Sequence, residues 1–162
     1  MIMKIAIYPG SFDPFTNGHK NIIERSVKIF DQIIVAVAHN TSKKTIFTVE
    51  ERVSILNEIF KDRDDVKVDY FEGLLVEYIK KMGTNVVLRG MRTVSDFEFE
   101  MQMALANKTL SSELETVFMV TDSEFSHISS SVIKEVVSLN GSASHMVPEI
   151  VETRLREKLL RS

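Results

Sequence analysis

The chain has 162 residues, of which 44% are hydrophobic and 27% charged, with a net charge of −3 and no cysteine. This length predicts a single domain over residues 1–162 with a sizeable core. The lack of cysteine excludes disulfides, thiolate catalysis and cysteine metal sites. The acidic balance argues against a nucleic-acid partner. Because no apolar run is long enough to cross a bilayer and no signal-peptide pattern opens the chain, we expect a cytoplasmic protein with no membrane partner.

The first 30 residues predict a strand, a glycine-containing loop and a helix. Residues 5–8 are an apolar run, and apolar residues recur at helical spacing over 21–30. The loop and the helix N-terminus present unpaired N–H groups that attract phosphate, and Gly10 lets the backbone approach a ligand closely. His19, at the helix entrance, offers an imidazole donor, and Ser11 a hydroxyl. The alternative is that these residues only form turns and cap the helix.

A second strand and a polar loop follow. Residues 33–38 are continuously apolar and rich in β-branched side chains, as in a strand covered on both faces. The loop after it carries Lys43 and Lys44, which reach a cleft if the loop emerges beside the first one. A solvated surface pair is the alternative. Thr48 and Glu51 have the spacing of a capping box and predict the start of a helix.

The middle of the chain repeats this alternation. Residues 66–70 alternate apolar and polar side chains and predict a third strand. A helix opens near Leu74 and is predicted to stop at Gly83, a residue typical of helix C-termini. Residues 86–88 form a short buried strand, the fourth.

Two arginines follow that strand, on either side of Gly90. Arg89 and Arg92 each offer a planar fork of donors that fits phosphate oxygens, and Gly90 permits close approach of the backbone. The alternative is a pair of structural salt bridges to acids of the next helix. These acids are Asp96, Glu98 and Glu100.

The next long helix is predicted to begin at Ser95, which has capping-box spacing with Glu98, and to run to about residue 110. Met101 and Met103 on this helix are interpreted as packing residues rather than cofactor contacts.

The last third of the chain predicts a fifth strand over 116–120 and a polar connector over 122–127. Three serines at 129–131 then crowd the first turn of a helix that ends before Gly141. One serine serves as a cap, and the same turn can bind phosphate. A final helix is predicted over about 148–161.

Five apolar strands alternating with helices predict an α/β fold with an open, doubly wound, five-stranded parallel sheet. Ligands bind such sheets at the carboxyl edge near the switch in strand order. The loops at that edge carry the histidine, lysines, arginines and serines, so we expect a cationic phosphate-binding cleft in an otherwise acidic protein. Neither a P-loop nor a G-x-G-x-x-G sequence is present, so kinase and dehydrogenase functions lose their usual support.

Thr16-Asn17-Gly18-His19 resembles the T/H-x-G-H signature of the nucleotidyltransferase superfamily. With the preceding residues 8–15, it is similar to the corresponding loop of the phosphopantetheine adenylyltransferase family. Further segments that resemble this family are 42–44, 47–52, 89–92, 96–100 and 128–131.

The resemblance implies a Rossmann-like nucleotidyltransferase that transfers the adenylyl group of ATP to 4′-phosphopantetheine, giving dephospho-coenzyme A and pyrophosphate. The implied catalytic residues are His19, Lys43, Arg92 and Ser130. The implied ATP contacts are Ser11, Phe12, His19, Gly90, Met91, Arg92, Glu100, Phe125, Ser126, His127, Ile128, Ser129, Ser130 and Ser131. The implied contacts with phosphopantetheine are Ser11, Lys43, Leu75 and Arg89.

The resemblance further implies Mg²⁺ bound with ATP rather than in a protein metal site, a homohexamer, and feedback inhibition by coenzyme A. The chain departs from the family at Ser11, where many members have threonine, and at Phe99, where some have tyrosine. The alternatives are a related nucleotidyltransferase with another phosphorylated acceptor, and a non-catalytic nucleotide-binding regulator. An RNA-binding accessory protein is disfavoured by the negative charge.

Overall fold

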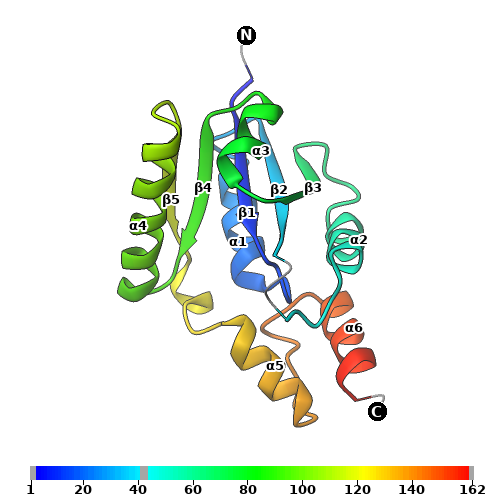
Figure 1. Cartoon of the computed structure of the whole chain (residues 1–162). Helices are drawn as coiled ribbons and strands as arrows, with labels where there is room; N and C mark the ends of the chain where they lie inside the picture. Colours follow the sequence, from blue (N-terminus) through cyan, green and yellow to red (C-terminus); the bar gives the residue numbers. More distant parts are fainter. Residues whose placement is uncertain (1–2, 41–43, 161–162) are drawn as a thin grey trace.

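The structure, a computed structural model, describes residues 3–40 and 44–160 (Figure 1). Its strands are β1 (Ile5–Gly10), β2 (Gln32–His39), β3 (Val66–Glu72), β4 (Val86–Met91) and β5 (Glu115–Val120). Its helices are α1 (Asn17–Ser26), α2 (Val49–Ile59), α3 (Leu75–Met82), α4 (Val94–Leu110), α5 (Ser130–Ser138) and α6 (Glu149–Leu159), with a short 3-10 helix at Ser123–Phe125.

The five strands form one parallel sheet in the order β3-β2-β1-β4-β5. The chain builds outward from β1 to β3, then crosses to the other side of β1 and continues outward through β4 and β5 (Figure 1). The strand order therefore reverses between β1 and β4, where ligands bind in sheets of this kind. This confirms the predicted doubly wound architecture.

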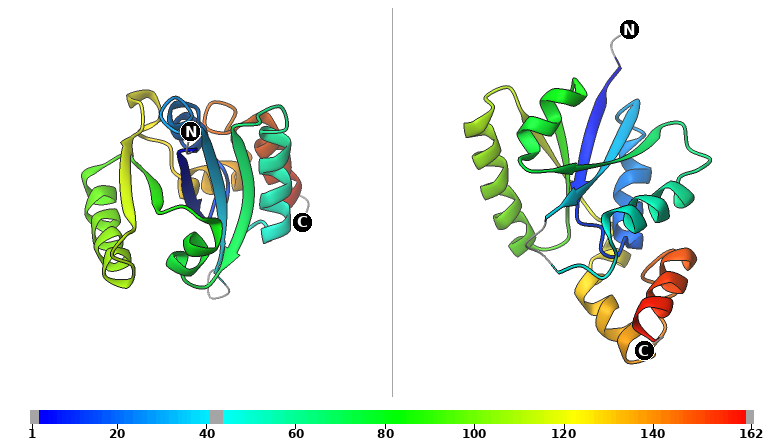
Figure 2. Two further views of the ribbon diagram at one scale, coloured as in Figure 1. Left: turned by 90° about the horizontal axis from the view of Figure 1, so that it is seen from above. Right: turned by 45° about the vertical axis from the view of Figure 1, so that its right-hand side comes forward.

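Alternate side chains of the central strands enter two separate apolar clusters. Ile33, Val35 and Val37 of β2 face a large cluster that includes residues of α1, α2, α5 and α6. Ile34 and Ala36 face a smaller cluster built mainly with α3. The left view of Figure 2 shows α1 on one side of the sheet and α3 and α4 on the other. This two-sided burial explains the continuous apolar run of β2.

Helix α4 is unusual because none of its 17 residues is buried. Met101 and Met103 are 40% and 45% exposed, and Phe99 and Leu105 are 60% and 62% exposed. The interpretation of the two methionines as packing residues is therefore not confirmed within the described chain, where neither is buried. Helix α4 lies along one edge of the molecule (Figure 1). Its large apolar side chains are exposed there.

Helices α5 and α6 lie next to each other beyond the carboxyl edge of the sheet (Figures 1 and 2). Pro148 precedes the first residue of α6 as its N-cap, and the helix ends at Leu159 rather than near residue 161. Their placement brings the N-terminus of α5 to the loop that follows β1. Across the ranges 3–40 and 44–160, no helix has the length and apolar character needed to cross a membrane.

Further predicted boundaries change in the structure. Strand β4 continues through Met91, because Arg89, Gly90 and Met91 all pair with β5, so Arg89 lies in the strand and not after it. Helix α1 covers Asn17–Ser26, so it includes His19 and ends four residues before the range of helical spacing at 21–30 does. Helix α4 is capped by Thr93, whose hydroxyl accepts from the backbone N–H of Asp96, and not by Ser95.

Candidate active site

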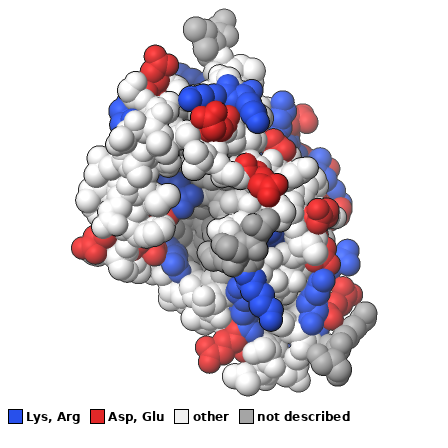
Figure 3. Space-filling model, viewed as in Figure 1, with Lys and Arg blue, Asp and Glu red and all other residues white. Residues whose placement is uncertain are grey.

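A cavity of about 390 Å³ opens at the carboxyl ends of β1 and β4. Its walls come from the loop after β1, the first two turns of α1, residues 44–45, strand β4, the first two turns of α4, and the N-terminus of α5. Figure 3 shows positively charged side chains around the hollow at the centre of this face. The cavity therefore lies at the switch in strand order, as predicted for the phosphate-binding cleft.

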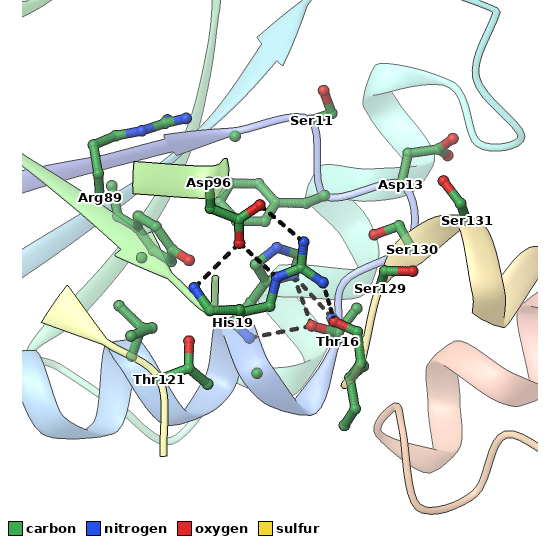
Figure 4. Close-up of a pocket in the computed structure, with 18 of the residues that line it drawn as sticks. Ser11, Asp13, Thr16, His19, Arg89, Asp96, Thr121, Ser129, Ser130 and Ser131 are labelled. Carbon is green, nitrogen blue, oxygen red and sulfur yellow. Dashed lines mark hydrogen bonds and ion pairs between the residues drawn. The ribbon is translucent and has the colours of Figure 1, made fainter. Parts of the chain in front are cut away.

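His19 occupies the third position of α1 and closes a capping box with Thr16 (Figure 4). The backbone N–H of Thr16 donates to His19 Nδ1 at 3.0 Å, and the Thr16 hydroxyl lies 3.1 Å from the same nitrogen. In return, the backbone N–H of His19 donates to Thr16 Oγ1 at 3.2 Å. Because Nδ1 is an acceptor, the proton of the neutral ring sits on Nε2, which is left as a donor.

The surroundings of the His19 ring keep it neutral. Its centroid lies 5.1 Å from that of Phe12 and 5.5 Å from that of Phe15, so the ring is enclosed by apolar groups. Burial, aided by the positive charges of Arg92 and Arg89, lowers the pKa of His19 from 6.5 to about 4. At neutral pH, His19 is therefore a hydrogen-bond donor without a charge, and it both caps α1 and lines the cavity.

Two glycines allow aromatic groups to pack tightly beside the site. A Cβ at Gly10 would lie 2.9 Å from the ring of Phe12, whose backbone adopts a φ of 48°, in the left-handed region. A Cβ at Gly90 would lie 3.1 Å from both Ile22 and the hydroxyl of Tyr8. Gly90 therefore lets α1 and Tyr8 come close to β4, a packing role in addition to the predicted close approach to a ligand.

Arg89 is held from two directions. Its Nε and Nη2 each donate to a carboxylate oxygen of Glu100 at 2.5 Å, which is a bidentate pair. Its Nη1 donates to the carbonyl oxygen of Pro9 at 2.6 Å. Glu100, on α4, thus orients Arg89 across the top of β1. The salt bridge considered as an alternative is present, and Arg89 still lines the cavity.

Arg92 is anchored in a similar way. Its Nε donates to Asp96 Oδ2 at 3.1 Å, and its Nη1 donates to the carbonyl oxygen of Ile128 at 2.5 Å. The backbone N–H of Arg92 also donates to Asp96. Arg92 thereby joins the start of α4 to the segment that precedes α5.

The three serines at 129–131, which we call the serine turn, have different partners. Ser129 is the N-cap of α5 and accepts from the backbone N–H of Val132 at 3.2 Å. The hydroxyl of Ser130 donates to the carbonyl oxygen of Pro14 at 3.1 Å, which ties α5 to the first loop. All three serines line the cavity. Capping accounts for Ser129 alone, as the sequence indicated.

The structure places most of the predicted site residues at this cavity. Those that line it are Ser11, Phe12, His19, Arg89, Gly90, Arg92, Glu100, Ile128, Ser129, Ser130 and Ser131. Those that do not line it are Leu75, Met91, Phe125, Ser126 and His127. Leu75 packs against the α3 cluster, and Phe125 packs against the large cluster. Lys43 lies outside the described residues.

Lining residues that the sequence did not reveal as site residues include two charged ones, Asp13 and Lys134. Asp13 is buried in the first loop, and Lys134 pairs with it from α5 at 3.2 Å. The available signal was the spacing of four between Ser130 and Lys134, which puts both on one face of a helix. The acidic lining residues Asp13, Asp96 and Glu100 are all in ion pairs. Among the described residues, no group of three or more acidic or histidine side chains is arranged to hold a metal ion.

Comparisons with known proteins agree with this geometry. Residues 7–136 match the cytidylyltransferase-like family. A phosphopantetheine adenylyltransferase of Caldanaerobacter subterraneus subsp. tengcongensis is 49% identical over 160 residues, covering 99% of this chain and 100% of that protein. One from Carboxydothermus hydrogenoformans is 52% identical, covering 96% of each chain.

The fold also resembles that of a solved Vibrio parahaemolyticus structure, provisionally described as a nicotinate-nucleotide adenylyltransferase. The TM-score is 0.64 at 19% identity, with 95% of this chain and 99% of that chain covered, so this likeness concerns the fold alone. The identity of about half over nearly the full length is more specific. The chain belongs to the phosphopantetheine adenylyltransferase family of cytidylyltransferase-like proteins.

Proposed function

We propose that this protein transfers the adenylyl group of ATP to 4′-phosphopantetheine, giving dephospho-coenzyme A and pyrophosphate. The observation that carries the proposal is the neutral His19 donor, held beside two anchored arginines in a cavity at the switch point. Such a site stabilises charge on phosphate oxygens. The family of the chain supplies the identity of the two substrates.

The reaction needs no side-chain base. A phosphomonoester has a second pKa near 6, so the acceptor is already largely a dianion at neutral pH. One of its oxygens attacks the α-phosphorus of ATP in line, the new P–O bond forms, and the bond to the pyrophosphate oxygen breaks. The protein supplies orientation and stabilisation of the charge that develops.

Each polar group receives a role from its place around the cavity. His19 Nε2–H donates to a non-bridging oxygen of the α-phosphate. Arg92 and the serine turn, which lie together through the bond from Arg92 to Ile128, hold the β- and γ-phosphates. Arg89 holds the phosphate of the acceptor. Lys43, which lies outside the described residues, receives its role on the same phosphate from the family resemblance alone. Glu100 acts by orienting Arg89.

Mg²⁺ enters as part of the substrate, as Mg·ATP. The carboxylates that line the cavity are already paired with arginine or lysine, which supports entry of the ion with the nucleotide rather than at a protein site. Mg²⁺ prefers phosphate oxygens and retained waters in nucleotide sites. The rate is therefore expected to follow the concentration of the Mg·ATP complex. Titrating Mg²⁺ at a fixed ATP concentration tests this expectation.

The deciding experiment measures pyrophosphate release by the purified protein with Mg·ATP and 4′-phosphopantetheine. Matched reactions contain pantetheine without the phosphate, nicotinamide mononucleotide, or CTP in place of ATP. Release only with ATP and the phosphorylated pantetheine supports the proposal. Release with another acceptor moves the protein to a related nucleotidyltransferase, and ATP binding without any release indicates a regulatory module.

The assembly, location and regulation typical of the family are also part of the proposal. We infer a cytoplasmic homohexamer, and the exposed apolar side chains of α4 are the feature that supports self-association. Coenzyme A carries both a pantetheine arm and an adenine nucleotide, so it competes for both halves of the cavity. Light scattering at micromolar protein concentration measures the assembly, and inhibition kinetics with coenzyme A measure the regulation.

A further inference from the structure

A single carboxylate joins three segments that are distant in the sequence. Asp13, in the loop after β1, is 6% exposed. Its Oδ1 accepts from the backbone N–H of Phe47 at 2.9 Å, and its Oδ2 accepts from the backbone N–H of Ile46 at 3.0 Å. Lys134 Nζ of α5 donates to Oδ2 at 3.2 Å. The first loop, the connection before α2, and α5 therefore meet at one side chain.

Arg52 of α2 provides a second fastening of the same loop. It is 3% exposed, and its Nη1 donates to the carbonyl oxygens of Ser11 at 2.6 Å and Ala38 at 3.2 Å. Its Nε donates to the carbonyl oxygen of Thr48 at 3.3 Å. Burial lowers the pKa of Arg52, and the negative charge of Asp13 opposes that effect. The two buried charges therefore support each other.

The fastened segments each contribute to the wall of the cavity. Lys44 and Thr45, which line the cavity, immediately precede the backbone that Asp13 holds. The serine turn lines another wall, one helical turn before Lys134. Figure 4 shows Asp13 beside Ser130 and Ser131, on the side of the cavity away from Arg89. Asp13 thus lies between the segment that approaches the acceptor and the turn that approaches ATP.

Asp13 is poorly suited to touch either substrate. Both of its oxygens already accept hydrogen bonds, and its negative charge repels phosphate. We propose that Asp13 is a positioning residue that sets the spacing between the Lys44 segment and the serine turn. In this arrangement Lys134 acts on ATP through Asp13, by holding α5 in place. This inference rests on the proposed function.

The first test separates the two walls. K134M removes the tie to α5 and leaves the backbone bonds of Asp13 in place, so it should raise the KM and Kd for ATP by about tenfold, the size expected for one charged hydrogen bond. The KM for 4′-phosphopantetheine should change less than about threefold. K134R retains a cation for Asp13 and should restore the ATP values to within about threefold of wild type.

The second test is a double-mutant cycle with D13N. The asparagine keeps the shape of Asp13 but turns an NH₂ group toward its donors, so both KM values should rise by about tenfold or more. Adding K134M to D13N should change the ATP values less than about threefold, because the tie is already lost. The matched control is K158M, which breaks an ion pair between α6 and α2 at Glu51, away from the cavity, and should leave both KM values unchanged.

Three results would overturn the inference. If K134M weakens ATP binding as much in D13N as it does in the wild type, Lys134 contacts ATP directly. Lower thermal stability with unchanged KM and Kd would make the tie merely structural. Failure of K134R to rescue the ATP values would show that the ion pair with Asp13 is not what holds α5, and this result does not require that D13N folds. Calorimetry distinguishes a failure of this inference from a failure of the proposed function. It measures the Kd for ATP even in a protein that releases no pyrophosphate.

Discussion

Replacing His19 by alanine tests the chemistry of the cavity most directly. The substitution removes the Nε2–H donor that we assign to the α-phosphate, and loss of one such donor costs about 10²–10³ in kcat, or roughly 3–4 kcal/mol. It also leaves the N–H of Thr16 without its acceptor at 3.0 Å. That structural loss is worth about 1–3 kcal/mol of folding free energy and lowers Tm by several degrees, roughly 2–4 °C per kcal/mol.

A control substitution at Thr16 separates the loss of catalytic rate from the loss of folding stability. T16V removes the hydroxyl that caps the N–H of His19 at 3.2 Å but keeps the backbone N–H that fixes the ring. It should cost about 1 kcal/mol of stability while reducing kcat far less than H19A does. Pyrophosphate release gives the rates, and thermal unfolding gives the stabilities. A folded H19A protein with kcat within about threefold of wild type would remove His19 from the mechanism.

The pH dependence of the same pair of proteins tests whether the donor is neutral. With a pKa of about 4, the ring stays uncharged from pH 8 to 5.5, although the acceptor phosphate titrates in this range. The ratio of wild-type to H19A rates should therefore stay constant across it. An imidazole with its ordinary pKa of 6.5 would gain charge in this window, and the ratio would change.

Three further predictions follow from single residues. The lowered pKa of His19 means that the unfolded chain binds this proton more tightly, so wild type should lose up to about 3 kcal/mol of stability relative to H19A as pH falls from 6.5 to about 4, measured by urea unfolding. S129A removes the N-cap of α5 and should cost about 1 kcal/mol in the same assay. F99D places a charge on the apolar surface of α4 and should shift light scattering toward smaller species, whereas Q102E on the same helix should not. An unchanged assembly in F99D would exclude this part of α4 from the interface.

The sequence predicted those features that depend on local patterns. The run 33–38 became β2 because its β-branched residues are buried on both faces. The capping box of Thr48 and Glu51 formed as expected. At α4, both Thr93-x-x-Asp96 and Ser95-x-x-Glu98 have a spacing suitable for an N-cap. The structure uses Thr93 as the N-cap. Asp96 is already held by Arg92, a tertiary contact that local spacing does not reveal.

The features that the sequence did not reveal depend on long-range pairing. Arginine and glycine are not strand-forming residues, so β4 was predicted to end at Leu88, but the ladder with β5 carries it on to Met91. Asp13 appeared to be an ordinary loop residue. Its partners are 33, 34 and 121 residues away in the sequence. Helix and strand periodicity relate only neighbouring residues, so it does not reveal contacts over such separations.

The ion pairs of the two arginines fix their geometry without exhausting their donors. A guanidinium has five N–H groups. In the part of the chain that the structure describes, Arg89 and Arg92 each use three of them on protein acceptors. Two donors on each remain for phosphate oxygens, and the carboxylates of Glu100 and Asp96 offset part of the positive charge. Under the proposed function, the cavity therefore selects its ligands by the direction of its donors as much as by charge, and this would let an acidic protein bind two anionic substrates.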